Sequence, residues 1–227
     1  MITPYDWQEG IGNRAQYIEG KLVAGSPVVA LSVSDGILLV THRRQTRKLF
    51  EIYDRVAFAG IGTQSDVEAI RIAAVDFASR EGYQRSEQDV TIQRIASAVS
   101  SPIKRAFGDF SSAPFVARSL FAEVNESPDA DLFYTVDYTG DYTVGRSQAV
   151  IAGDEAIFVT LTERLSEVDC AKSAAELLDA VLELWQAAVT PEDGSREEAF
   201  EGLKPEALLI ERSDVRVDRF RRLTPEE

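Results

Sequence analysis

The 227-residue sequence has one cysteine, one histidine and no apolar run that approaches the roughly 20 residues needed to span a membrane. A single cysteine, Cys170, excludes a disulfide within the chain and is typical of a reducing compartment. One cysteine and one histidine cannot form a Cys/His metal cluster, although carboxylates remain available as ligands. The first residues, with Asp6 and Glu9, lack the basic and apolar regions of a secretory signal. We therefore expect a cytoplasmic protein with no cofactor and no bound metal.

Positive charge is also scarce, because 24 lysines and arginines face 38 aspartates and glutamates, which leaves a net charge of −14. With no net attraction to phosphate and only short arginine clusters, the chain is not expected to bind nucleic acid. Only five of the basic residues are lysines. A hydrophobic content of 44% at this length is enough for a complete core, and we expect one domain.

Two apolar runs and a tight turn open the informative part of the chain. Residues 28–33 and 37–40 are strands without polar alternation, which indicates burial on both faces, and the Asp35-Gly36 pair between them suits a hairpin turn. A segment rich in arginine and lysine, residues 43–48, follows and is called the basic link below. A third strand is expected at residues 56–59.

Helical periodicity predicts an amphipathic helix over residues 6–23 that lies outside the core, with an apolar stripe that includes Trp7 and Leu22. A capping box at Ser65 and Glu68 predicts a second helix that Gly82 ends. Ser86 and Asp89 are expected to cap a third, which Pro102 interrupts. Two more helices are expected at residues 154–165 and 171–189.

Strands of an antiparallel meander are expected at residues 115–124, 132–138 and 142–149, and a last pair at 207–210 and 215–220. The order is three strands, two helices, three strands, two helices and two strands. It favours an α+β fold, a four-layer αββα sandwich with two antiparallel sheets between helix pairs.

Two long segments carry a family resemblance, IYDRVAFAGIGTQSDVEAIRIAAVDFASREGYQRSEQDVT at residues 52–91 and ALLIERSDVRVDRFRRLT at 207–224. With the strands before them, they resemble the non-catalytic α-type subunit of actinobacterial proteasomes over about residues 5–224. The resemblance implies the Ntn-hydrolase fold. It also implies a gate segment and ring-face helix at 1–25, the sandwich domain at 26–224 and a flexible tail at 225–227.

In that family the α-type subunits form a heptameric ring. The ring caps β-type peptidase subunits, controls the entry of unfolded protein substrates and binds the C-terminal tails of an ATPase activator. The resemblance implies a gate made of Ile2, Thr3, Pro4 and Tyr5.

An activator-binding pocket is implied at Lys48, Gly62 and Thr63. An ammonium in a groove can pair with a tail carboxylate, and a glycine lets a peptide approach the backbone closely. Thr63 stands where archaeal relatives have leucine. The alternative is that Lys48 is an ordinary surface lysine of the basic link.

Catalytic members of the superfamily expose an N-terminal threonine whose position falls on Ser26, after Gly25. Pro27 is a poor start for the strand of a nucleophile, and the family's aspartate position falls on His42, so only Lys48 matches the catalytic set. We therefore expect no catalytic residues. Two alternatives remain open: a self-processing hydrolase that uses Ser26, and a scaffold ring without a peptidase partner.

The remaining histidine, cysteine, aromatic and acidic residues of interest are interpreted as structural. His42 is expected to be structural or exposed, and Cys170 to be a small core or boundary residue. Four aromatic residues on paired strands are expected to pack across the sheet: Phe133, Tyr134, Tyr138 and Tyr142. Four acidic residues near turns are expected to form turns and helix caps: Asp137, Asp141, Asp154 and Glu155.

Overall fold

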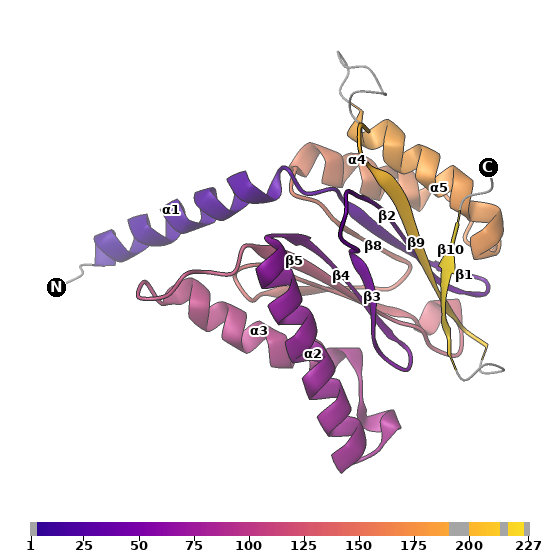
Figure 1. Ribbon diagram of the computed structural model, residues 1–227, viewed down its shortest axis with the longest axis horizontal. Coiled ribbons are helices and arrows are strands. Elements are labelled where there is room, and N and C mark those ends of the chain that lie inside the picture. The colour runs from indigo at the N-terminus through magenta and orange to yellow at the C-terminus, as the bar shows by residue number, and fades with distance from the viewer. Residues whose placement is uncertain (1–3, 191–199, 214–217, 225–227) are drawn as a thin grey trace.

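The computed structural model describes residues 4–190, 200–213 and 218–224, and two five-stranded antiparallel sheets form its centre (Figure 1). In the order of hydrogen-bonded neighbours, the first sheet runs β10 (Phe220–Leu223), β9 (Lys204–Glu211), β2 (Gly36–Arg43), β1 (Val28–Val33) and β8 (Gln148–Ile151). The second sheet, again in the order of hydrogen-bonded neighbours, consists of β3 (Leu49–Tyr53), β4 (Val56–Gly62), β5 (Ala117–Glu123), β6 (Leu132–Val136) and β7 (Tyr142–Gly145).

Helices cover the outer face of each sheet, so the expected four-layer αββα sandwich is confirmed (Figure 1). The helices are α1 (Pro4–Leu22), α2 (Gln64–Gln84), α3 (Ile92–Gly108), α4 (Glu155–Ser166) and α5 (Ala174–Val189), with short 3-10 turns η1 (Glu87–Asp89) and η2 (Pro128–Ala130). Helices α2 and α3 pack on the second sheet, and α4 and α5 pack on the first.

Strand β1 shows why its sequence has no polar alternation. Val28 and Ala30 point into the core between the two sheets, whereas Val29 and Leu31 point into the core beneath α4 and α5. Successive side chains of a strand alternate between its faces, and both faces of this strand are covered. The expected burial of the first two strands on both faces is therefore confirmed.

The structure has more strands than the sequence predicted. Residues 49–53, which follow the basic link, form β3 and pair with β4 through a bulge between Glu51 and Tyr53. The expected single strand at 142–149 is wrong, because this segment forms two strands, β7, which ends at Gly145, and β8, which begins at Gln148. These two strands belong to different sheets, β7 pairing with β6 and β8 with β1.

Several helix boundaries also differ from those expected. Thr63, not Ser65, is the N-cap of α2, and Glu68 pairs with Arg71. Gly82 does not end α2; it lies inside the helix against Tyr53, where a larger residue would clash.

In the other helices, Ser86 bonds Asp89 at the 3-10 turn η1, whereas Thr91 is the N-cap of α3. Pro102 lies within α3 without interrupting it. Helix α5 begins at Ala174 behind a capping box of Ser173 and Glu176, not at residue 171. The last strand is described at 220–223 instead of 215–220, of which 215–217 lie outside the described residues.

Helix α1 projects from the sandwich, as expected for a helix outside the core (Figure 1). Its second half is anchored, because Ile18 and Leu22 are fully buried. Glu19 accepts a 2.8 Å hydrogen bond from the Tyr138 hydroxyl. In the middle of the helix, the Arg14 guanidinium donates to carbonyl oxygens at the C-terminal end of α3. Trp7, near the start, remains 50% exposed, so the chain itself covers only part of the expected apolar stripe.

Candidate functional site

The half-buried Lys48 lies at the end of the sandwich where β1 begins and β4 ends. Its ammonium donates a 2.5 Å hydrogen bond to the backbone carbonyl of Ser26. Its backbone N–H donates to the Glu206 carboxylate on β9 at 2.9 Å. The site therefore joins two segments that lie far apart in the sequence, one just before β1 and one in β9.

Glu206 is an almost buried carboxylate that sequence reasoning missed. Besides the Lys48 amide, it faces Arg222 at 3.3 Å and Arg43 at 3.7 Å. Burial lowers the pKa of Lys48 to about 8, and the negative charge of Glu206 opposes that shift. The one sequence signal that could have indicated Glu206 is its position as a charged residue directly before the apolar run 207–210 of β9.

Gly62, which Thr63 follows, lies near the Gly25-Ser26 segment that the Lys48 ammonium contacts. The ideal Cβ of Gly25, which directly precedes Ser26, would lie 3.9 Å from the Gly62 amide nitrogen, so the two glycines approach closely. Gly62 has φ +125°, and a Cβ there would lie 2.1 Å from the Val116 carbonyl oxygen. Only glycine fits these constraints without strain. The fold thus gathers Lys48, Gly62 and Thr63 at one end of the sandwich.

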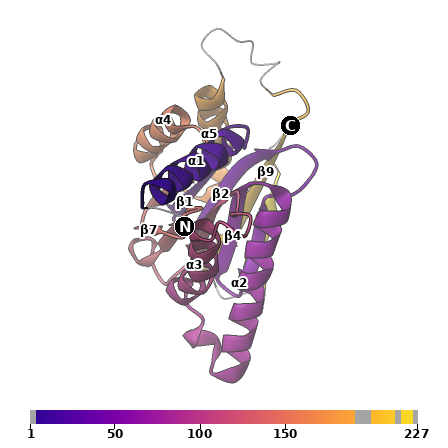
Figure 2. The ribbon, with the colours of Figure 1, turned by 90° about the vertical axis from the view of Figure 1, so that its left-hand side faces the viewer.

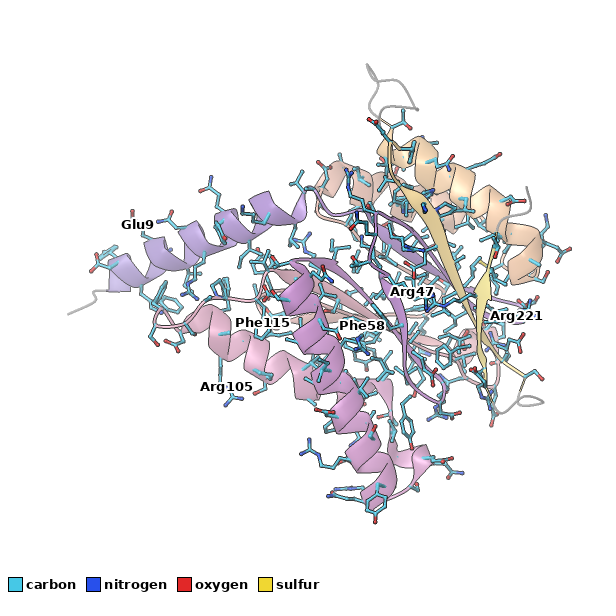
Figure 3. All side chains as sticks on the ribbon, viewed as in Figure 1. Glu9, Arg47, Phe58, Arg105, Phe115 and Arg221 are labelled. Carbon is cyan, nitrogen blue, oxygen red and sulfur yellow. The ribbon has the colours of Figure 1, made fainter. Side chains whose placement is uncertain are left out.

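A groove of about 300 Å³ adjoins this cluster. Thr46, Arg47 and Phe50 line one side of it, and the first turns of α2 line the other. Arg47 is exposed and lies next to β3 (Figure 3). Lys48 does not itself line this groove, and the carboxylate of Glu68, which does, is paired with Arg71. A partly apolar groove next to an ammonium suits a short peptide with a terminal carboxylate.

Ser26, at the position that carries the nucleophile in catalytic members of the superfamily, lies in a segment held by backbone hydrogen bonds. The Ser26 carbonyl accepts a hydrogen bond from the Lys48 ammonium, and the next carbonyl, of Pro27, accepts hydrogen bonds from the Thr41 hydroxyl and the Trp185 indole. These bonds fix the backbone at the start of β1.

His42 is only 2% exposed, and its ring centroid lies 4.3 Å from that of Trp185. Burial lowers its pKa to about 4, so the ring is neutral at pH 7. His42 is therefore a buried core residue, which agrees with the structural interpretation of its sequence position.

Two of the four expected gate residues, Ile2 and Thr3, lie outside the described residues. Pro4 is the first residue of α1, and Tyr5, in its first turn, is 82% exposed. Nothing in these positions tests the gate, which remains a prediction.

The other predicted residues have structural contacts. Asp154 is the N-cap of α4 and accepts hydrogen bonds from two backbone amides. Phe133 is in the core, and the rings of Tyr134 and Tyr142 pair at 5.5 Å. Cys170 is half-buried at the edge of the core beneath α4 and α5, and burial raises the pKa of its thiol.

A membrane-spanning helix and a metal site are both missing from the part of the chain that the structure describes. No helix in it is both long and apolar enough to cross a membrane. Within the same residues, no group of three or more histidine, cysteine, aspartate or glutamate side chains could hold a metal ion.

The chain is similar to known proteins along most of its length. The family model "Proteasome subunit" matches residues 23–189. The "Proteasome subunit alpha" of Thermobifida fusca is 34% identical over 155 residues, which is 67% of this chain and 62% of that protein. The subunit of the same name from Acidothermus cellulolyticus is 31% identical over 74% of each chain. The one from Streptomyces griseus is 26% identical over 98% of this chain and 82% of its own.

Proposed function

Because the chain belongs to the proteasome subunit family and resembles its α-type members, we propose that it is a non-catalytic subunit that controls access to a separate peptidase. Seven copies form a ring on rings of β-type peptidase subunits. Unfolded protein substrates pass through this ring in the cytoplasm, and an ATPase activator binds to its outer face. The chain contributes architecture and an activator-binding surface rather than catalytic residues.

The observation that carries this proposal is the cluster of Lys48, Gly62 and Thr63 beside a groove. The Lys48 ammonium supplies a positive charge for the terminal carboxylate of an activator tail. Gly62 lets the Val116 backbone pack closely against it and so fixes the chain beside the lysine, and Phe50 supplies an apolar contact. In the isolated chain, the Ser26 carbonyl is the acceptor of the ammonium, so a bound carboxylate would add to or replace that hydrogen bond.

The N-terminal residues fit the gating part of the proposal. Helix α1 is anchored at its C-terminal half, whereas its first turn, with Tyr5 and Trp7, extends away from the sandwich. An exposed apolar start of an anchored helix suits a contact with a neighbouring subunit. In this arrangement Ile2, Thr3, Pro4 and Tyr5 are directed toward the ring axis as the gate.

Replacement of Lys48 tests the activator-binding role. The Lys48→Ala variant is co-expressed with the β-type subunit, and degradation of an unfolded protein is measured with and without the ATPase. We expect loss of the ATPase-dependent rate, with ring assembly and activator-independent peptide hydrolysis retained. Lys172→Ala, at an exposed position, is the matched control. An ATPase-dependent rate unchanged by Lys48→Ala would contradict the assignment.

Native mass spectrometry separates the proposal from its alternatives. A full-length chain in sevenfold rings, which join β-type rings into four-ring particles, supports the α-type role. Loss of the first 25 residues would instead indicate a hydrolase that processes itself at Ser26. Sevenfold rings that bind no β-type subunit would favour the scaffold.

A further inference from the structure

A groove of about 410 Å³ lies on the edge of the sandwich formed by β7 and β8, away from the Lys48 cluster. Its walls come from the ends of β6 and β8, the start of β7 and the first turns of α4. Val136, Val150 and Ile151 form an apolar floor, and Phe158 is partly exposed at its side. The floor residues are already at most 6% exposed, so Phe158, at 37%, offers the apolar surface that a partner can cover.

Carboxylates give this groove an acidic rim. Asp137 is already paired, because it accepts a 3.1 Å hydrogen bond from Arg118. The other two rim carboxylates, Asp141 and Glu155, are exposed and form no ion pair with any residue that the structure describes. The groove therefore presents two negative charges beside apolar surface, an arrangement that suits arginine, whose charged head follows a long apolar stem.

The basic link, residues 43–48, presents the complementary side chains. Arg43 faces Glu206 within the chain. Arg44 and Arg47 are exposed and make no ion pair among residues 4–190, 200–213 and 218–224. The link leads into β3, the edge strand of the second sheet. Within those residues, the chain thus carries two unpaired positive charges toward one edge and two unpaired negative charges at the opposite edge.

Strand register places both features at the same end of the sandwich. Val28 at the start of β1 pairs with Thr41, just before the link, and with Ile151, at the end of β8 next to the groove. Figure 2 shows β7 and α4 on one side of the molecule and β9 on the other. The two patches therefore lie at a similar level on opposite edges, as expected if identical copies meet head to tail and close into a ring.

We infer that the basic link of one copy docks on the acidic-rimmed groove of the next, with Arg44 and Arg47 facing Asp141 and Glu155 of the neighbour. This inference rests on the proposed ring and specifies which surfaces form its contact. The arginine stems cover the exposed Phe158 ring while the charged heads reach the rim carboxylates. The contact fixes the head-to-tail orientation of the subunits, because two acidic grooves that faced each other would repel.

Charge reversal on either face tests the pairing. Asp141→Arg with Glu155→Arg reverses the groove, and Arg44→Glu with Arg47→Glu reverses the link. The quadruple variant restores opposite charges with their positions exchanged. Glu163→Arg with Glu167→Arg, at exposed positions in and just after α4 and outside the groove, makes the same charge change as the groove variant. Each full-length chain is co-expressed with the β-type subunit, and ring stoichiometry is read by native mass spectrometry.

We expect each reversed face to reduce the ring fraction by about tenfold or more, the quadruple variant to recover rings, and the α4 control to assemble like wild type. Circular dichroism of each variant checks that the fold is kept. Rings that form normally with either face reversed would overturn the docking while leaving the proposed function intact. Failure of the quadruple variant to recover rings would overturn the pairing. A wild-type chain that never forms rings would overturn both the docking and the proposed function.

Discussion

The pKa of Lys48 near 8 makes a sharp prediction about activator binding, because the charge of its ammonium then changes between pH 7 and pH 9. Burial disfavours the charged form, so Lys48 loses its proton at a lower pH than a lysine in water. With a pKa of about 8, about nine-tenths of the chains carry the ammonium at pH 7 and about one-tenth at pH 9.

Only the protonated chains can pair with a carboxylate through this ammonium, and a bound carboxylate keeps the proton in place. The affinity for a tail peptide with a free C-terminal carboxylate should therefore fall about tenfold from pH 7 to pH 9. Lys48→Arg keeps its charge throughout this range and should remove the pH dependence.

The assay is titration calorimetry of assembled particles with an acetylated peptide that has the C-terminal sequence of the cognate ATPase. The same peptide with a C-terminal amide is the control, since it lacks the partner of the ammonium and should bind weakly at every pH. Equal affinity of the carboxylate peptide for wild-type particles at pH 7 and pH 9 would refute the reasoning. So would an equal decline for wild type and Lys48→Arg.

Three further predictions follow from the described contacts. Because the pKa of His42 is lowered to about 4, its ring binds a proton below about pH 6.5 in the unfolded chain but stays neutral in the folded chain. His42 should therefore reduce the free energy of unfolding by up to about 3 kcal/mol as pH falls from 6.5 to 4. Urea unfolding at both pH values should show a smaller loss of stability for His42→Gln. Asp131 is fully buried and paired with Arg212 at 2.8 Å, so Asp131→Ala should lower the free energy of unfolding by about 3–5 kcal/mol and reduce the urea midpoint. A loss below about 1 kcal/mol would show that the pair is dispensable. Gly62→Ala should reduce the melting temperature and the soluble yield, because its Cβ would lie 2.1 Å from the Val116 carbonyl oxygen at a positive φ; a melting temperature equal to wild type would show that the backbone can relax.

The buried ion pair of Asp131 and Arg212 also shows which kind of feature the sequence hides. Arg212 donates to both carboxylate oxygens of Asp131 and to the carbonyl of Val33. Ser32 donates to the same carboxylate at 2.5 Å. These residues come from β1, the position directly after η2 and the position directly after β9. No local pattern marks them as partners, because each is an ordinary polar residue beside a turn or strand.

Local patterns were reliable where the physical cause is local. The apolar runs of β1 and β2 indicated burial on both faces, and the structure agrees. Asp154 was expected as a cap and bonds the first amides of α4. Boundaries failed where tertiary packing decides them: Gly82 stays helical beneath Tyr53, and Pro102 lies within α3.

The sequence by itself determined the order of most elements and the sandwich class, because hydrophobic periodicity and caps depend on neighbouring residues. The candidate lysine came from the family resemblance. Only the tertiary structure decided that β8 leaves the meander for the other sheet and that Lys48 lies against Glu206, 158 positions away. It also decided the protonation of Lys48 and His42, since a pKa depends on the atoms that replace water around a group. Strand pairing over such distances is set by the packing of whole sheets, which no local window of sequence contains.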